Sequence, residues 1–565
     1  MDNVRLILIM ALAFLSMLIW EAWQEDYVIP QQRQQQQQQQ AVGPAVDTPA
    51  DLVSTEGGET PQAPINAAID TPAAGIDNMQ QQAATRSSQG TQLVHVMTDT
   101  LDLRIDTRGG SIVDAKLVGY PVSVDTPDIK YHLLSQRPSD YFIAQSGLLG
   151  ADKERTPNHQ AVFQSMQDSY VMRDGEDDLV VDLTWRSPDG VEVIKRYTFT
   201  RGQHSFKLEH LVNNQSASDW AGREYRQLQR GKPADSGSFF MYTYTGSAIY
   251  SQEDKYQKYD FEDLGSGSLD RDVTDGWIAM IQHYFLAAFV PPRGETQHFY
   301  GKQLNNGRAV IGTYTPAQSL APGQQGKFEG IVVVGPKLQS ELEPLAEGLD
   351  LTVDYGWLVF IAKPMHWILE WINSFVGNWG WTIIIFTILI KAVFFKLSET
   401  SYKSMANMRK MTPRIQALKD RYGDDKQRMQ QAMMEMYKKE KINPLGGCLP
   451  MLVQIPFFIA LYWVLLESVE MRQAPWILWI QDLSIKDPYF VLPIIMAASM
   501  FIQMKLNPAP PDPMQAKIMM YLPLVFGVMF AFFPAGLVLY WVVNNLLSIA
   551  QQWVITRRIE AGEKA

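Results

Sequence analysis

The stretch TIIIFTILIKAVFFK, residues 382–396, decides the fold class of this 565-residue chain. A helix needs about 20 mainly apolar residues to cross a bilayer, and this run belongs to such a segment. Comparable apolar runs follow it toward the C-terminus, several of them short or containing proline. We therefore expect a polytopic α-helical membrane protein. The expected spans in this part of the chain are residues 378–397, 445–466, 490–506, 518–533 and 535–553.

The N-terminal residues 1–23 contain another apolar stretch, which is followed by EAWQ at 21–24. A stretch of this kind is either a cleavable signal peptide or an uncleaved anchor. Residues 21–24 offer no small-residue cleavage site, and the run approaches the length of a span. We expect an uncleaved anchor at 1–23, which brings the total to about six spans.

Residues 24–92 have the composition of a linker. They include a Gln-rich tract at 34–40 and continue through Pro, Ala, Thr, Ser and Gly with few aromatic residues. Such a segment has too little apolar surface to offset the entropy lost on ordering. We expect a disordered tether here.

Residues 93–345 show the alternation typical of strands. LDLRI at 101–105 and FKLEH at 206–210 place every second side chain on one sheet face. Turn signals separate the runs, as in the Gly109-Gly110 pair and the SPDG motif at 187–190. The pattern predicts a large antiparallel β-sandwich domain.

Residues 355–376 are too polar for a membrane span. Lys363, Pro364, His366 and Glu370 lie among three tryptophans. This mixture is typical of an amphipathic helix at the membrane interface.

The distribution of basic residues predicts the orientation of the spans. Residues 396–441 contain 12 Lys and Arg against 6 Asp and Glu, whereas the loop at 467–489 contains two against four. Cytoplasmic loops are enriched in Lys and Arg, so the first segment is expected inside and the second outside the cytoplasm. Both termini, the loop at 507–517 and the tail at 554–565 are then cytoplasmic, and the β-domain lies outside the cytoplasm.

The cytoplasmic segment 399–442 is expected to be a basic helical hairpin. A stripe of Met, Ile, Leu and Tyr predicts two helices, with a left-handed Gly423 ending the first and Asp424 or Asp425 capping the second. The hairpin is either a solvated pair without a partner or a site for varied protein or ribonucleoprotein partners. Its candidate contact residues are Met405, Met408, Arg409, Lys410, Arg414, Lys419, Arg421, Lys426 and Arg428.

No enzyme signature is present in the sequence. Gly-x-Ser-x-Gly, His-Glu-x-x-His and Walker A motifs are absent, and the eight histidines are scattered. The one cysteine, Cys448, excludes an intramolecular disulfide and lies in an apolar run, where a buried thiol is expected. We expect no enzymatic activity, no cofactor and no metal.

Polar residues inside the expected spans are candidates for function because they are costly in hydrocarbon. Lys391 lies five residues before Lys396, roughly 7 Å deeper in a helix. Its ammonium either lines a wet cavity or reaches the interface along its flexible stem. The remaining polar and aromatic groups either join helices or line the same cavity. They are Thr387, Gln454, Gln503, Tyr540, Trp541, Asn544 and Asn545.

Several motifs in this half of the chain resemble one protein family. They are NPLGGCLP at 443–450, QIPFF at 454–458, RQAP at 472–475, DPMQ at 512–515 and FPAGL at 533–537. In this order they resemble the YidC membrane protein insertases of Gram-negative bacteria. The anchor, tether and large β-domain resemble that family too, so the likeness covers essentially the whole chain.

The resemblance implies a five-helix insertase core with a hydrophilic groove and a β-supersandwich in the periplasm, to which we assign no ligand. Lys391 stands where the family usually has arginine, and Trp541 where we expect tyrosine. The charge is kept, but the bidentate fork of arginine is lost. The apolar slide for the substrate helix is assigned to Ile455, Phe458, Val525 and Met529.

The same resemblance implies the partners of the chain. They are nascent membrane proteins, the lipid bilayer, the Sec translocon with its accessory subunits, and the ribosome and targeting machinery through the hairpin. The expected function is insertion and folding of inner-membrane proteins, alone or with the translocon, by a chain acting as a monomer. A secondary transporter or channel is the alternative, since broken helices with polar groups also suit that role. An inverted repeat would favour it, and none is found.

Overall fold

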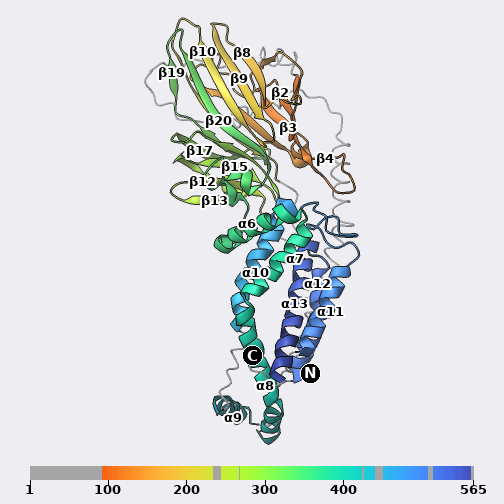
Figure 1. The fold of residues 1–565 in the computed structure, drawn as a ribbon. Helices are drawn as coiled ribbons and strands as arrows, with labels where there is room; N and C mark the ends of the chain where they lie inside the picture. Colours follow the sequence, from red (N-terminus) through yellow and green to blue (C-terminus); the bar gives the residue numbers. More distant parts are fainter. Residues whose placement is uncertain are drawn as a thin grey trace, which may run out of the picture. The chain divides into compact units, whose positions relative to one another are not determined.

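The computed structural model describes residues 92–232, 243–265, 267–422, 425–439, 449–506 and 513–560. The expected anchor at 1–23 lies outside these residues. So do the expected tether up to residue 91 and the cysteine at 448. Within the described residues, strands fill most of 93–336, and helices follow (Figure 1).

Two sheets make up the β-domain in the part of the chain that the structure describes. The larger has 11 strands. Its order is β14(Asp270–Thr274), β17(Thr296–Gln303), β18(Ala309–Tyr314), β11(Trp220–Arg230), β5(Phe142–Leu149), β3(Ser111–Pro121), β2(Leu101–Asp106), β1(Leu93–Met97) and β7(Ser169–Val171), with β19(Gln318–Leu320) on β11 and β4(Lys130–Leu134) on β3.

The second sheet has 9 strands in the same described part. Its order is β13(Lys255–Tyr259), β12(Gly246–Ser251), β15(Trp277–Ile281), β16(Phe285–Val290), β20(Gln325–Pro336), β10(Ser205–Asn214), β9(Val191–Thr200), β8(Asp178–Arg186) and β6(Gln164–Ser165). Pairing is antiparallel except between β1 and β7. The expected antiparallel sandwich is confirmed.

The core of the sandwich follows from the alternation in the strands. Along β9 every second residue is buried, and Tyr197 and Phe199 join Leu103 and Ile105 of β2 in one apolar cluster. The cluster takes residues from both sheets, which is how a sandwich removes one face of each sheet from water. This burial is the main stabilisation of the domain.

One buried charge closes the turn at Gly109-Gly110. The fully buried ammonium of Lys195 donates hydrogen bonds of 2.8 Å to the Gly109 carbonyl and 3.1 Å to the Ser146 carbonyl. Burial lowers the pKa of Lys195 to about 7. Gly109 has a φ of +70°, and a Cβ there would lie 2.2 Å from the carbonyl oxygen of His159. The turn therefore requires glycine at this position.

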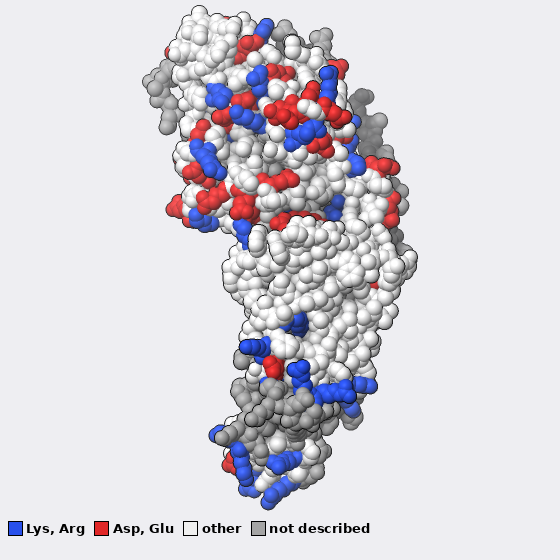
Figure 2. Space-filling model, in the orientation of Figure 1, with Lys and Arg blue, Asp and Glu red and all other residues white. Residues whose placement is uncertain are grey.

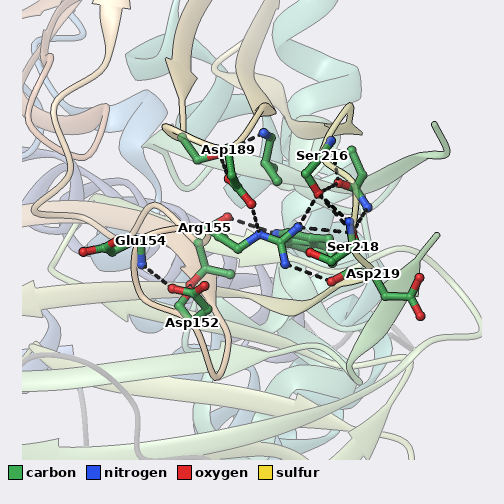
Figure 3. Close-up of polar contacts among 12 residues, drawn as sticks. Asp152, Glu154, Arg155, Asp189, Ser216, Ser218 and Asp219 are labelled. Carbon is green, nitrogen blue, oxygen red and sulfur yellow. Dashed lines mark hydrogen bonds and ion pairs between the residues drawn. The ribbon is translucent and has the colours of Figure 1, made fainter. Parts of the chain in front are cut away.

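An arginine ties three loops of the sandwich together (Figure 3). Nε of Arg155 lies 2.7 Å from Oδ2 of Asp189, in the predicted SPDG turn. Its other guanidinium nitrogens donate to the Asp219 carbonyl at 2.9 Å and to Oγ of Ser216 at 2.5 Å. A planar guanidinium suits this role because its donors point in fixed, divergent directions.

The helical part begins after β20. Its elements are α5(Gln339–Leu342), η3(Leu349–Thr352), η4(Gly356–Leu358), α6(Val359–Val376), α7(Trp379–Val393), α8(Phe395–Tyr422), α9(Lys426–Lys439), α10(Leu449–Glu467), η6(Val469–Met471), α11(Val491–Leu506), α12(Pro513–Phe530) and α13(Ala535–Glu560). Two further short helices, η2(Pro138–Asp140) and α4(Phe261–Gly265), belong to the β-domain.

Helix α6 coincides with the segment expected at the membrane interface. Ala362, Met365 and Leu369 are buried on one face, whereas Trp367 and Trp371 are exposed on another. The helix ends at Gly377, whose φ of 65° lets its amide return to the Asn373 carbonyl at 2.8 Å. An exposed face rich in aromatic rings is typical of an interfacial helix.

The expected span 378–397 contains a break in the structure. Asn378 caps α7 by accepting a hydrogen bond from the Trp381 amide, and α7 ends at Val393. The chain then bends by 61° into α8. Within the described residues, no single helix is both long and apolar enough to meet the usual criterion for a span, whereas α7 and the first part of α8 meet it as a bent pair.

Helices α8 and α9 form the expected hairpin after the bend. Oδ1 of Asp425 accepts a hydrogen bond of 3.1 Å from the Arg428 amide, so Asp425 caps α9. The alternative cap, Asp424, and the expected helix end at Gly423 lie outside the described residues.

The β-domain contacts the end of α10 and the segment that follows it. The His283 ring lies 2.9 Å from the Leu466 carbonyl through Nε2. The Arg472 guanidinium donates 2.6 Å to the Pro121 carbonyl and lies over the rings of Tyr131 and Phe285. These contacts use backbone carbonyls and aromatic faces, so they leave few polar groups without partners at the junction.

The surface of the helical part differs from that of the sandwich. On the face drawn in Figure 2, acidic and basic side chains are mixed over the strands, whereas the surface over the helices below them is largely uncharged. Lys and Arg gather again at the end formed by α8 and α9. An uncharged belt bounded by charged surfaces is what a bilayer selects.

Candidate functional site

A cavity of about 430 Å³ lies between six of the described helices, α7, α8, α10, α11, α12 and α13. Polar and apolar side chains both line it. The residues that line it are Lys391, Ser398, Ser401, Tyr402, Gln454, Ile455, Phe458, Met500, Gln503, Met504, Met519, Leu522, Pro523, Tyr540, Trp541, Asn544, Asn545 and Ser548.

Lys391 is the charged group of this cavity. Its side chain is 9% exposed, and its ammonium donates a hydrogen bond of 2.7 Å to Oγ of Ser548 on α13. The Ser548 hydroxyl donates in turn to the Asn544 carbonyl at 2.7 Å. Among the described residues that line the cavity, none is acidic, so the charge of Lys391 is not neutralised there. An uncompensated cation in surroundings of low dielectric attracts anions strongly.

Aromatic rings form the wall between the two helices α10 and α13. Phe458 stacks on Tyr540 with ring centroids 6.0 Å apart and meets Trp541 edge-on at 4.5 Å. The indole nitrogen of Trp541 and the amide nitrogen of Gln454 are buried and have no hydrogen-bond partner among the described groups. Both residues line the cavity, and in each the unpaired donor itself is buried.

Most of the residues predicted for the groove meet in this cavity. Lys391, Gln454, Gln503, Tyr540, Trp541, Asn544 and Asn545 all line it, together with Ile455 and Phe458 of the predicted slide. Asn545 also donates to Oγ of Ser499 at 3.2 Å, so it joins α13 to α11 as well.

Three predicted residues lie elsewhere. Thr387 is buried, and its hydroxyl donates 2.6 Å to the Ile383 carbonyl of its own helix, so it does not reach the cavity. Its back-bond is the ordinary way for a threonine to satisfy itself in a helix. Val525 is 46% exposed outside the cavity, and Met529 packs against the apolar core of the helices.

Several lining residues were not predicted from the sequence. Ser398, Ser401 and Tyr402 of α8 contribute hydroxyl groups, and Ser548 holds the Lys391 ammonium. Ser548 lies one turn after Asn544 on the same helix face, a spacing that could have identified it. The residues of α8 gave no such signal, because Ser401 and Tyr402 were assigned to the cytoplasmic hairpin and Ser398 lies between that hairpin and the preceding span.

The hairpin carries the second group of predicted contact residues. Arg414, Arg421 and Arg428 are exposed on α8 and α9. The side chains of Met405, Met408, Arg409, Lys410, Lys419 and Lys426 lie outside the described residues.

Two family models match this chain. The model described as YidC periplasmic domain matches residues 93–368, and the model described as 60Kd inner membrane protein matches residues 371–563. A membrane protein insertase YidC from Thioalkalivibrio sulfidiphilus is 53% identical, over 100% of both chains. The chain belongs to the YidC family.

A second YidC relative agrees with this assignment. One from Methylococcus capsulatus is 50% identical over 99% of both chains. A solved structure of an active YidC insertase is 19% identical, covers 82% of this chain and 92% of its own, and superimposes with a TM-score of 0.37. The resemblance predicted from the sequence motifs is confirmed by the family models and the curated relatives.

Membership of the YidC family settles the broad function of the chain. It is an inner-membrane protein with a periplasmic β-sandwich domain and a helical insertase region. It is a membrane protein insertase rather than an enzyme, and it therefore acts on membrane-protein substrates in the lipid bilayer. The cavity contains no His, Cys, Asp or Glu among its described lining residues, so it offers no ligand set for a metal.

Proposed function

We propose that the cavity around Lys391 receives the polar tail of a substrate and so allows the substrate's apolar helix to enter the lipid. The observation that carries this proposal is the ammonium of Lys391. It lines a cavity of about 430 Å³, is held by a neutral hydroxyl and faces no described carboxylate. A carboxylate on the entering tail is the partner that this charge lacks.

The apolar residues in and near the cavity support a path for the substrate helix. Ile455 on α10 is 43% exposed, Val525 on α12 is similarly exposed, and Phe458 lines the cavity and stacks on Tyr540 of α13. We assign the slide to these residues and Met529. Burying a helix releases about 25 cal/mol per Å² of apolar surface, and the membrane potential adds about 2.3 kcal/mol per charge per 100 mV. This energy suffices for a short polar tail, without nucleotide hydrolysis.

The topology that fits this mechanism has six spans with both termini in the cytoplasm. The excess of Lys and Arg in residues 396–441 supports a cytoplasmic hairpin. We propose that Arg414, Arg421 and Arg428, which are exposed, belong to the surface that receives substrates from the ribosome and targeting machinery. Cooperation with the Sec translocon and its accessory subunits belongs to the same proposal, as does action as a monomer and as a folding chaperone.

The experiment is insertion into liposomes that contain the purified full-length chain, scored by protease protection of a small substrate with an acidic N-tail. Lys391→Arg should retain insertion because the charge remains. Lys391→Ser should slow acidic tails several-fold and neutral tails much less. The matched control is Lys396→Ser, which removes the same charge from an exposed position just beyond the break. Equal rates for Lys391→Ser and Lys396→Ser on acidic tails would remove the charge from the mechanism.

A further inference from the structure

A histidine and two glutamates meet away from the cavity, where α6 contacts η6. Nδ1 of His366 lies 3.7 Å from Oε2 of Glu370, one turn later on α6. Nε2 of the same ring lies 3.6 Å from Oε1 of Glu470 on η6. One ligand atom from each residue can be chosen so that all lie within 4.8 Å of one another. Three potential metal ligands from two elements therefore lie close together around one imidazole ring.

The side chains of His366, Glu370 and Glu470 lack hydrogen-bond partners and lysine or arginine partners among the described residues. His366 is 3% exposed, and both carboxylates lie beyond hydrogen-bond distance of its nitrogens. In the described part of the chain, neither Glu370 nor Glu470 forms an ion pair with a lysine or arginine. Two partly buried carboxylates without a lysine or arginine partner repel each other, which destabilises the folded protein. A divalent cation bound between them would offset this repulsion.

The separations suit an ion between the ligands. Zn²⁺ binds imidazole nitrogen and carboxylate oxygen at about 2.0–2.2 Å, so two ligands of a tetrahedral ion lie roughly 3.4 Å apart. The observed nitrogen to oxygen distances of 3.6 and 3.7 Å are close to that value. Because the two carboxylates face different ring nitrogens, one must move. Glu370 is the more exposed, at 36% against 13% for Glu470, and has the freedom to do so.

We propose that His366, Glu370 and Glu470 bind one divalent transition-metal ion of the Zn²⁺ class. The ion joins α6 to η6 and so clamps the interfacial helix onto the segment that follows α10. The imidazole favours Zn²⁺ over Mg²⁺ or Ca²⁺, which prefer oxygen ligands alone. Three protein ligands leave one position of a tetrahedral ion for water. Under the proposed topology the site lies on the periplasmic side.

The test uses the tag-free full-length chain in lipid nanodiscs, stripped with a chelator and titrated with ZnCl₂. One equivalent should bind, and His366→Phe and Glu470→Gln should each weaken binding at least tenfold, as expected for losing one of three ligands. Glu370→Gln removes the most exposed ligand, and it should also weaken Zn²⁺ binding. This variant tests the proposal even if the variants at the two buried positions do not fold. Zn²⁺ should raise the melting temperature of the unsubstituted chain, and Mg²⁺ at equal concentration should not.

The matched control is another histidine between two carboxylates. His298 lies 2.5 Å from Oδ1 of Asp270 and 2.8 Å from Oδ1 of Asp272, within hydrogen-bond distance of both. His298→Asn should leave the stoichiometry and affinity for Zn²⁺ unchanged. Loss of binding in His298→Asn but not in the His366 and Glu470 variants would overturn the proposal. So would the absence of any binding below roughly 100 μM Zn²⁺.

Discussion

The ammonium of Lys337 donates a hydrogen bond of 3.0 Å to Oε2 of Glu467, and both side chains are only 2% exposed. Lys337 directly follows β20, and Glu467 is the last residue of α10. A second hydrogen bond, of 3.2 Å, runs from the same ammonium to the Thr352 carbonyl. The pair therefore joins the β-domain to the insertase region at a place that water does not reach.

We predict that Lys337→Met destabilises this junction. It leaves the Glu467 carboxylate buried without a cation, which typically costs about 3–5 kcal/mol. The double variant Lys337→Met, Glu467→Leu should recover most of that loss. The measurement is thermal unfolding of the full chain in detergent, analysed as a double-mutant cycle. Lys207→Met is the control, because the side chains of Lys207 and its partner Glu329 are 44% and 32% exposed. Loss of this exposed ion pair should lower the unfolding free energy by about 1 kcal/mol or less.

The same junction should weaken in acid because of His283. Burial, with a smaller effect of the Lys337 charge, lowers the pKa of His283 to about 4. The folded ring stays neutral where the unfolded one, with a pKa near 6.5, binds a proton. The stabilisation that the neutral His283 ring gives to the folded protein is therefore full above pH 6.5 and is lost as the pH falls toward 4. At pH 5 the loss is about 2 kcal/mol.

The measurement for His283 is the unfolding free energy of the full chain between pH 5 and 8. His283→Phe should flatten the profile in this window, whereas His95→Phe, which removes a half-exposed ring, should not. A parallel slope in the His283 variant would assign the acid sensitivity to other groups.

Gly380 should tolerate no side chain. A Cβ at Gly380 would lie 2.1 Å from Cδ1 of Trp476, whose ring packs against the start of α7. We predict that Gly380→Ala lowers stability by about 1–3 kcal/mol through overpacking. Gly119→Ala is the control, since nothing lies within 4 Å of its Cβ position. Thermal unfolding measures both, and equal shifts would mean that the Trp476 ring moves aside freely.

Ser548→Ala should impair insertion by misplacing Lys391. Removing the hydroxyl frees the ammonium from its 2.7 Å hydrogen bond, so the charge samples more positions in the cavity. A hydrogen bond to a charged group contributes about 1.5–3 kcal/mol, and water replaces part of it, so we expect a loss of roughly fivefold for acidic tails. Ser548→Thr keeps the hydroxyl and should insert acidic tails at the rate of the unsubstituted chain. Neutral tails, measured in the same liposome assay, should respond little.

Much of this molecule was predicted from local patterns. The two-residue alternation in segments such as 101–105 predicted the sandwich. The polar residues among the tryptophans at 355–376 predicted an amphipathic helix at the membrane interface rather than a span. The motifs at 443–458 and 533–537 predicted the family. In each case neighbours along the chain carry the signal, because a strand or helix repeats within a few residues.

The tertiary structure decided which polar groups meet. The sequence predicted Thr387 as a residue that joins helices or lines the cavity, whereas its hydroxyl bonds the Ile383 carbonyl of its own helix. Packing of α13 against α7 brings Ser548 to the Lys391 ammonium instead. Likewise, His366 and Glu470 are 104 positions apart in the sequence, and nothing local relates them. Periodicity determines which residues share a face of a helix. The rotation of one helix against another depends on how all their side chains pack, and so only the folded chain determines it.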